Sequence, residues 1–481
     1  MRRLPVALGG HIFAVARTPP PRVTGAQNEQ RQSHSAQRPS SGHPHSWNVD
    51  LTRDGASQGW RGYLKAMGPG LVTGASDDDP SGVATYSQAG AQFGLGLLWV
   101  SLLTLPLMAG VQEICDRTAL ATGRGLGELA TEKFKTRTRP VLIVLISALI
   151  VANALNISAD LVAVGSGMNL LHAGPTWVWA LIAGVVITAL VIVGSFTEIA
   201  RVFKIICLAL LTYFVVLFSI RVNWGRVGLH TVVPHITLSS SYFALLVAVL
   251  GTTISPYLFF WQSAHRLEEL REEPEGGDRP VALKDRTEED AKYKLRTARG
   301  DVFTGMAFSN AVMFAIIVVT ATTLHGKKIN SAADAANALK PVAGHWSSVL
   351  FALGFIGTGM LAIPVLAGSG ASGMAGLLGK RWGFSRSVRK APVFYGLVAV
   401  GTVGGTILSL LASNPIHLLV LVAVINGIAA APFLFVVMLI ARDSAIMGEY
   451  RNGKLASTLG WLAFALMAAA ALVMLAQYLH L

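Results

Sequence analysis

Apolar segments long enough to cross a bilayer recur along this chain, and they constrain its fold more than any other feature. From residue 66 onward, runs of about 18 or more mainly apolar residues return, and each could form one spanning helix. We place eleven of them, at residues 66–88, 93–115, 139–164, 175–194, 200–220, 242–264, 302–323, 346–370, 392–412, 416–440 and 457–478. Only 14% of the residues are charged, whereas soluble proteins carry about 25%. The chain is therefore predicted to be an all-α, multi-pass membrane protein.

The segment before the first span has a different composition. Residues 1–62 contain no apolar run of spanning length, and Thr18 to Gln58 are rich in Pro, Gln, Ser, Arg and His. Such a segment cannot bury enough apolar surface to fold alone. We predict a disordered, basic, cytoplasmic tail over residues 1–62 and a transmembrane domain of eleven helices over residues 63–481.

The positive charges predict the orientation of these helices. With the N-terminus in the cytoplasm, only five of the 39 Lys and Arg residues fall outside, namely Arg221, Arg226, Lys327, Lys328 and Lys340. Cytoplasmic loops of membrane proteins carry more Lys and Arg than the loops on the other side. Because the number of predicted spans is odd, the C-terminus is then expected outside. We therefore interpret the net charge of +13 as a sign of membrane orientation and of contact with the lipid bilayer. It is not taken as a sign of nucleic-acid binding. We expect a cytoplasmic membrane of bacterial type.

The first span contains three consecutive aspartates followed by a proline, Asp77-Asp78-Asp79-Pro80. A proline within a helix removes one backbone hydrogen bond and breaks or kinks the helix. An ionised carboxylate near the bilayer centre costs about 2.5–3.5 kcal/mol, so a lipid-facing position is excluded for three of them. These side chains must face a water-filled cavity, be partly protonated, or hold a cation.

The sixth span repeats this interruption. It reads Gly251-Thr252-Thr253-Ile254-Ser255-Pro256-Tyr257, with small and hydroxylic residues around the proline. Breaks in corresponding positions of two halves indicate a transporter built from inverted repeats. We predict one five-helix repeat in spans 1–5 and an inverted one in spans 6–10, with helices 1 and 6 broken at mid-membrane and an eleventh helix appended. Simple proline kinks are the alternative.

The residues around these breaks resemble the Nramp family of divalent-metal transporters. The resemblance includes Gly68-Pro69-Gly70 with Asp79-Pro80 in span 1, and Pro256 in span 6. It also includes Gln92-Phe93-Gly94, Leu97-Leu98-Trp99, Gln112, Arg117 and Thr122-Gly123-Arg124 around span 2, and Ala159-Asp160-Leu161 in span 3. The resemblance covers spans 1–10 in outline. It implies a LeuT-like fold that carries a divalent metal ion through a site at the bilayer centre.

The chain departs from the family pattern at five positions. The family's Gly and Asn after the first proline are Ser81 and Gly82, its Met and His around the second are Ser255 and Tyr257, and its Glu in span 3 is Ala163. Without the thioether, the site offers only oxygen ligands, which suit Mg²⁺, Ca²⁺ and Mn²⁺. Mg²⁺ keeps several waters and needs few carboxylates, and Asp-Pro-Ser-Gly is similar to the family's magnesium-transporting branch. We therefore expect Mg²⁺ as the transported ion, with Mn²⁺ as a co-substrate.

Two groups of candidate residues follow from the breaks and the resemblance. Asp79 is the first metal ligand, direct or water-bridged, and it can also cap the second half of span 1. The rest of the metal group comprises the Thr252 carbonyl, the Ser255 hydroxyl, Asp78 and Gly82. Gly82 is included because its lack of a side chain leaves space at the site. The access and coupling group comprises Asp77, Tyr257, Asp160 and Asn426.

Other functions remain open at this point. An ordinary proton-coupled Mn²⁺ or Fe²⁺ importer of this family is the first alternative, although Tyr257 and Ala163 remove two titratable groups and leave Asp160. An organic-substrate symporter of the same fold would receive a carboxylate at a half-helix N-terminus, which three aspartates would repel. An intramembrane aspartyl protease needs two aspartates sharing a proton, and Asp79 with Asp160 is the one plausible pair. We predict no enzymatic activity and no cofactor, because the metal ion is the transported substrate.

Overall fold

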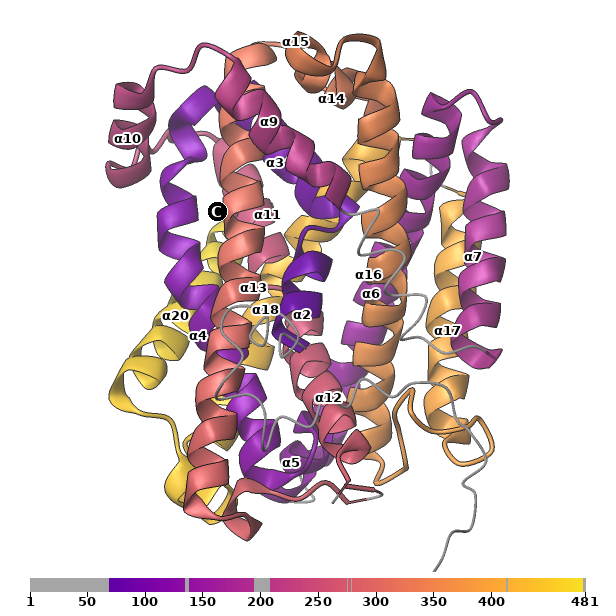
Figure 1. Ribbon diagram of the computed structural model, residues 1–481, viewed down its shortest axis with the longest axis vertical. Helices are drawn as coiled ribbons and strands as arrows, with labels where there is room; N and C mark the ends of the chain where they lie inside the picture. Colours follow the sequence, from indigo (N-terminus) through magenta and orange to yellow (C-terminus); the bar gives the residue numbers. More distant parts are fainter. Residues whose placement is uncertain are drawn as a thin grey trace, which may run out of the picture. The chain divides into compact units, whose positions relative to one another are not determined.

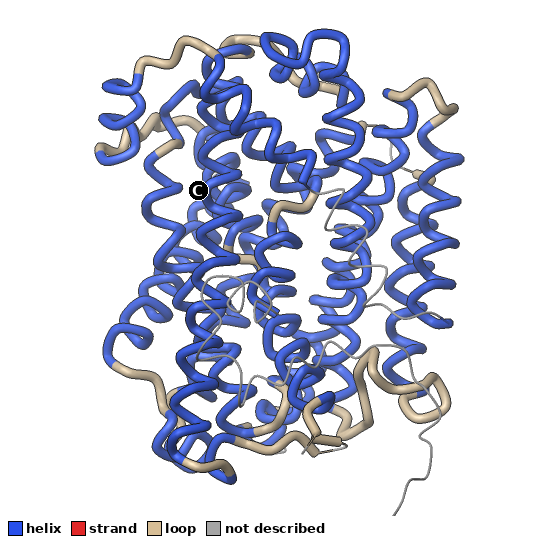
Figure 2. Tube along the Cα trace, in the orientation of Figure 1, coloured by secondary structure: helices blue, strands red, loops and turns tan. Residues whose placement is uncertain are grey.

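The computed structural model describes residues 69–134, 138–193, 208–274, 276–277, 279–411 and 414–478, all within one compact unit, Asn48–Leu481. Over these residues, all regular secondary structure is helical (Figure 2). The predicted tail, residues 1–62, lies outside the described residues.

The first and sixth spans are each split into two helices, as predicted. The first consists of α2 (Pro69–Asp77) and α3 (Pro80–Phe93), and the sixth of α11 (Ser240–Thr253) and α12 (Pro256–Glu272). In both spans the proline occupies the start of the second helix. Its fixed φ suits the first helical position, where the missing N–H has no helical partner to lose. The simple-kink alternative is therefore wrong, because the residues between the helices leave the helical conformation.

The remaining helices follow the predicted spans with shifted ends. Within the described residues, eight segments are long and apolar enough to cross a membrane, counting α11 with α12, and the bent pair Pro80–Leu97 and Trp99–Thr122 qualifies together. The predicted fifth span, 200–220, lies partly outside the described residues. The other helices are α4 (Trp99–Thr122), α5 (Leu126–Lys133), α6 (Arg139–Leu170), α7 (Thr176–Val193), α9 (Thr212–Ser219), α10 (Trp224–Val232), α13 (Glu288–Thr323), α14 (Ala332–Ala336), α15 (Lys340–Ala343), α16 (Ser347–Leu377), α17 (Pro392–Ser409), α18 (Pro415–Ala441), α19 (Ser444–Met447) and α20 (Lys454–Tyr478).

The second span begins later than predicted because of a tight turn. Residues Gly94–Leu97 form a 3-10 turn, so α4 starts at Trp99 and not at residue 93. Gly94 has φ = 58°, a left-handed conformation that glycine adopts without steric cost. Between α3 and α4 the chain bends by 108°.

Glycines let the broken helices approach their neighbours closely. A Cβ on Gly74 of α2 would lie 2.2 Å from the Gly305 carbonyl oxygen of α13. A Cβ on Gly251 of α11 would lie 2.1 Å from the Ala423 carbonyl oxygen of α18. Figure 1 shows α2 and α12 among the long helices that surround them. Both broken spans are thus packed backbone to backbone against continuous helices.

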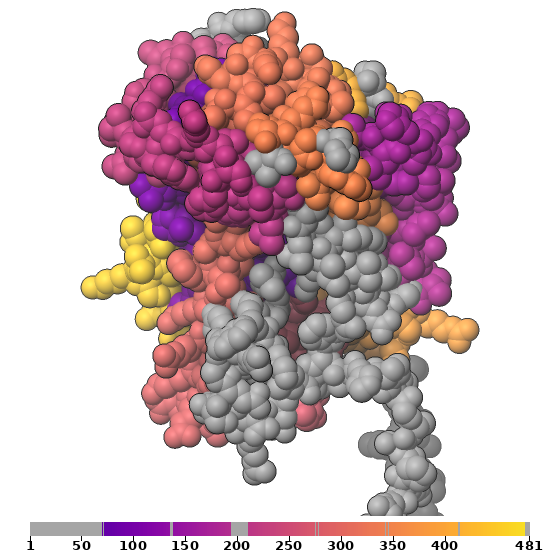
Figure 3. Space-filling model, turned by 45° about the horizontal axis from the view of Figure 1, so that its top comes forward, coloured from indigo at the N-terminus to yellow at the C-terminus, as the bar shows by residue number. Residues whose placement is uncertain are grey.

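Shorter helices lie at one end of these spans. Figure 3 looks onto the end where residues of α10 and of α14 and α15 form much of the visible surface. The helix α9 packs against α13, and α14 packs against α16.

A candidate metal site at the two helix breaks

Side chains from the two broken spans meet at their interruptions. The Tyr257 hydroxyl, in the first turn of α12, donates hydrogen bonds to Asp79 Oδ2 at 3.3 Å and to the Ser76 carbonyl at 3.4 Å. On the α11 side, a Cβ on Gly82 would lie 3.2 Å from Thr252 Oγ1. The structure therefore places Asp79, Gly82 and Thr252, from the predicted metal group, next to Tyr257, from the predicted access and coupling group.

Asp79 is held in a fixed orientation as the N-cap of α3. Its Oδ1 accepts hydrogen bonds from Ser81 Oγ at 2.6 Å and from the Gly82 backbone N–H at 2.8 Å. Its side chain is buried, with 1% of the residue exposed. The capping role predicted for Asp79 is confirmed, and its Oδ2 faces the α12 side of the break.

Asp77 and Asp78 share one hydroxyl donor on α13. Ser309 Oγ lies 2.5 Å from Asp77 Oδ2 and 3.3 Å from Asp78 Oδ1. Among the described residues, the second oxygen of each carboxylate has no hydrogen-bond partner. Both aspartates are buried, so Asp77 does not face an open, hydrated funnel in this state. Buried carboxylates without compensating donors are costly unless a cation or a proton neutralises them.

The break in the sixth span leaves a carbonyl that the local side chain partly satisfies. Because Pro256 has no N–H, the Thr252 carbonyl loses its helical donor. Ser255 Oγ donates to this carbonyl at 3.0 Å and to the Gly251 carbonyl at 2.6 Å. A carbonyl oxygen has two lone pairs, so Thr252 keeps one acceptor position. The Ser255 hydroxyl therefore works here as a cap for α11.

Asp160 and Asn426 flank the breaks from two continuous helices. Asp160 lies on α6, and a Cβ on Gly359 would lie 3.2 Å from its backbone carbonyl and 3.4 Å from the Pro80 ring. Asn426 lies on α18, one residue before Gly427, which packs against α11. Both side chains are buried, and neither has a hydrogen-bond partner among the described residues.

The site does not resemble a preformed cage of strong metal ligands. Over the described residues, no three His, Cys, Asp or Glu side chains converge closely enough to hold a metal ion. The oxygens at the breaks come from the Asp79 carboxylate, the Thr252 carbonyl and nearby hydroxyls. Such a donor set can bind a hard cation only with retained water or after a change of conformation.

Sequence reasoning missed a buried ion-pair cluster next to α2. Arg266 Nε of α12 donates to Asp116 Oδ1 of α4 at 2.7 Å, and Arg266 Nη2 lies 3.2 Å from Asp301 Oδ2 of α13. Arg266 also pairs with Glu269. The Arg266, Asp116 and Asp301 side chains are only 7%, 1% and 2% exposed. The available signal was a set of opposite charges just beyond the ends of three predicted spans.

The same cluster ties α2 to its neighbours. The Gly70 backbone N–H donates to Asp301 Oδ2 at 2.8 Å. Thr73 Oγ1 donates to Gln262 Oε1 at 2.5 Å, and Gln262 Nε2 donates to Asp116 Oδ1 at 3.0 Å. The first half of the broken span is therefore attached to α4, α12 and α13 through one polar network.

Comparison with known proteins relates this architecture to a transporter family. The family model "Natural resistance-associated macrophage protein-like" (Nramp) matches residues 70–477. The divalent metal cation transporter MntH of Verminephrobacter eiseniae is 28% identical over 420 residues, covering 84% of this chain and 87% of that protein. The MntH protein of Deinococcus radiodurans is 26% identical over 414 residues, covering 84% of this chain and 88% of that protein.

A solved structure shares the fold. The manganese transporter of Eremococcus coleocola, in complex with an aromatic bis-isothiourea substituted compound, superposes with a TM-score of 0.68. The match covers 87% of each chain at 16% sequence identity. The predicted all-α, LeuT-like fold is thereby confirmed.

Proposed function

Because this chain belongs to the Nramp family, we propose that it moves a divalent metal ion across the membrane by alternating access. The relatives that support this proposal are named divalent metal cation transporters. The observation that carries it is the meeting of both helix breaks at the buried Asp79 carboxylate. The ion is the transported substrate, and the proposal requires no enzymatic activity and no cofactor.

Manganese is the first candidate for the transported ion. The alternative of an Mn²⁺ transporter fits the comparisons better than the Mg²⁺ interpretation, because the solved neighbour is described as a manganese transporter. An all-oxygen donor set suits Mn²⁺ as well as Mg²⁺. The absence of a thioether at Ser255 therefore does not favour Mg²⁺ over Mn²⁺.

We propose that the metal lies between the two breaks. Asp79 supplies a carboxylate oxygen, Thr252 supplies its free carbonyl lone pair, and the Ser255 hydroxyl and water complete the shell. Asp78 adds negative charge beside them, and Gly82 leaves space, since a Cβ there would lie 3.2 Å from Thr252 Oγ1. A divalent cation at this place would offset the cost of burying the neighbouring carboxylates.

The second group of residues surrounds this metal position. Tyr257 controls one oxygen of Asp79, and Asp77 adds charge on the α13 side. Asp160 is a buried acid without a partner in the described part of the chain, which makes it the candidate for coupling to protons. We propose that Asn426 contacts the water shell of the metal from α18.

The proposed membrane placement follows from the positive charges. The chain is a multi-pass membrane protein with relatives in bacteria. We propose that its N-terminus lies in the cytoplasm and its C-terminus outside, in a cytoplasmic membrane. Cysteine labelling at residues added to each end of the chain would test this orientation in intact cells.

Uptake into proteoliposomes tests the function directly. Mn²⁺ and Mg²⁺ are offered in parallel to the wild type, to Asp79→Asn, and to Asp285→Asn as a control for the same change at an exposed residue. We expect Mn²⁺ uptake by the wild type and by Asp285→Asn, and background uptake by Asp79→Asn. Imposed pH gradients show whether protons move with the metal. Normal Mn²⁺ uptake by a folded Asp79→Asn protein would refute the proposed site.

A further inference from the structure

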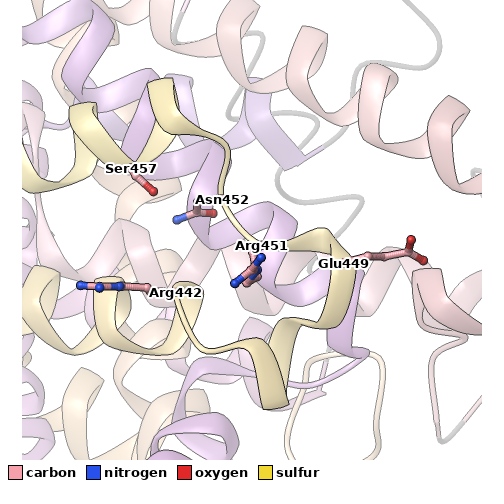
Figure 4. A pocket seen from close by; sticks show the side chains of 5 residues that line it. All are labelled: Arg442, Glu449, Arg451, Asn452 and Ser457. Atoms are coloured by element: carbon pink, nitrogen blue, oxygen red, sulfur yellow. The ribbon is translucent and has the colours of Figure 1, made fainter.

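A small polar pocket lies far from the helix breaks, where the chain connects α18 to α20. It has a volume of about 220 Å³ and is lined by Arg442, Glu449, Arg451, Asn452 and Ser457 (Figure 4). Arg442 follows the last residue of α18, and Ser457 lies in the first turn of α20. The pocket thus sits at one end of two membrane-spanning helices.

The charge of this pocket is positive. Within the described part of the chain, neither the Arg442 nor the Arg451 guanidinium makes an ion pair, while Asp443 is engaged by Lys133 Nζ at 2.5 Å. The Glu449 carboxylate extends away from Asn452 and Ser457 (Figure 4). Two guanidinium groups are therefore available for an anion, and their planar donor pairs match phosphate oxygens.

A buried amide in the pocket also lacks a partner. The side-chain nitrogen and oxygen of Asn452 are both buried without a hydrogen bond to any described residue. Leaving such groups unpaired is unfavourable. A ligand with acceptor oxygens would pair with the Asn452 amide N–H and with the Ser457 hydroxyl.

An exposed apolar face begins beside the pocket. Leu455 and Leu462 of α20 are 74% and 49% exposed, and their separation of seven residues places them on one face of the helix. The spanning window of α20 is only 22% buried inside the protein. This face therefore borders the lipid, and an acyl chain can lie along it.

We propose that the pocket between α18 and α20 binds the phosphate of an anionic phospholipid, with an acyl chain along Leu455 and Leu462. Basic pockets between membrane helices bind such headgroups. The Arg451 carbonyl also accepts from Arg117 Nη1 of α4 at 3.5 Å. A lipid bound to Arg451 would therefore contact a segment that is itself hydrogen-bonded to α4.

Native mass spectrometry of the delipidated full-length protein tests this proposal, using phosphatidylglycerol and phosphatidylcholine as probes. The pocket variant is Arg442→Gln with Arg451→Gln. The control is Arg389→Gln with Lys390→Gln, which removes the same charge from the exposed connection between α16 and α17 at the same end of the helices. We expect the pocket variant to bind phosphatidylglycerol about tenfold or more weakly, and the control to bind it as the wild type does.

Two further measurements distinguish a specific lipid site from general charge attraction and from a site for free phosphate. The variant Arg442→Lys with Arg451→Lys keeps the charge and loses the paired donors, so its affinity should fall between those of the wild type and the Gln variant. Millimolar inorganic phosphate should leave the melting temperature of the wild type unchanged. The proposal is overturned if the pocket and control variants bind alike, if the Lys variant binds as the wild type does, or if free phosphate stabilises the protein through these arginines.

Discussion

Tyr257 donates a hydrogen bond to Asp79 Oδ2 at 3.3 Å and so joins the break in one spanning helix to the break in another. Because Ser81 and Gly82 already donate to Oδ1, both oxygens of this carboxylate are engaged. A metal ion that binds Asp79 must share Oδ2 with Tyr257 or displace its hydroxyl. At the proposed metal site, Tyr257 would therefore compete with the metal ion for Asp79 Oδ2, at a position where the family pattern has a histidine.

Removing the Tyr257 hydroxyl should strengthen metal binding. A single hydrogen bond contributes about 1 kcal/mol, so Tyr257→Phe should tighten Mn²⁺ binding about fivefold. Calorimetry on the purified protein measures this affinity, and Tyr293→Phe serves as a control at an exposed tyrosine. Weaker binding by Tyr257→Phe would show that the hydroxyl supports the bound metal and does not oppose it.

Restoring a thioether at the second break should change the preferred ion. Soft sulfur ligands select softer metals, so Ser255→Met should let Cd²⁺ inhibit Mn²⁺ uptake at concentrations lower by on the order of tenfold. The variant Ser255→Ala separates the two effects, because it loses the donor to the Thr252 carbonyl without adding sulfur. If Ser255→Ala and Ser255→Met respond alike to Cd²⁺, residue 255 is not a metal ligand.

Breaking the buried ion-pair cluster should destabilise the protein strongly. Arg266→Met leaves Asp116 and Asp301 buried without their cation, and loss of one partner of a buried pair costs about 3–5 kcal/mol. Arg299→Met is the matched control, because the Arg299 side chain is 55% exposed beside Glu113 and an exposed pair contributes about 1 kcal/mol or less. Thermal unfolding in detergent compares the two variants. Equal melting temperatures for Arg266→Met and Arg299→Met would show that the buried cluster contributes no more stability than an exposed ion pair.

A methyl group at Gly251 should force α11 away from α18. The added Cβ would lie 2.1 Å from the Ala423 carbonyl oxygen, and such overpacking costs about 1–3 kcal/mol. Gly396→Ala in α17 is the control, since nothing lies within 4 Å of its added Cβ. We expect a lower melting temperature for Gly251→Ala only. An unchanged value would mean that the two helices separate at no cost.

The sequence was sufficient to predict both helix breaks and the residue at their junction. A proline after buried polar residues leaves few alternatives, so residues 77–82 and 251–257 predicted the split spans and the capping role of Asp79. The start of α4 was misplaced, because the left-handed conformation of Gly94 cannot be deduced from hydropathy. The preference for Mg²⁺ was also inferred from the sequence, and the comparisons favour Mn²⁺.

The ion-pair cluster could not be predicted for a different reason. Asp116, Arg266 and Asp301 lie just past the ends of predicted spans, where charges are normally solvated and contribute to topology. Only the packing of α4, α12 and α13 shows that they face one another. Hydropathy locates the ends of helices, but it contains no information about which ends are neighbours.

Arg266 compensates two acids that belong to two different helices, and this arrangement restricts how the chain can evolve. Losing the arginine alone leaves two buried carboxylates without their cation, whereas losing either acid alone leaves the arginine paired with the other acid. We therefore expect an acid at position 116 or 301 among relatives only where position 266 is basic. A relative that lacks the arginine but keeps both acids would need another cation beside them.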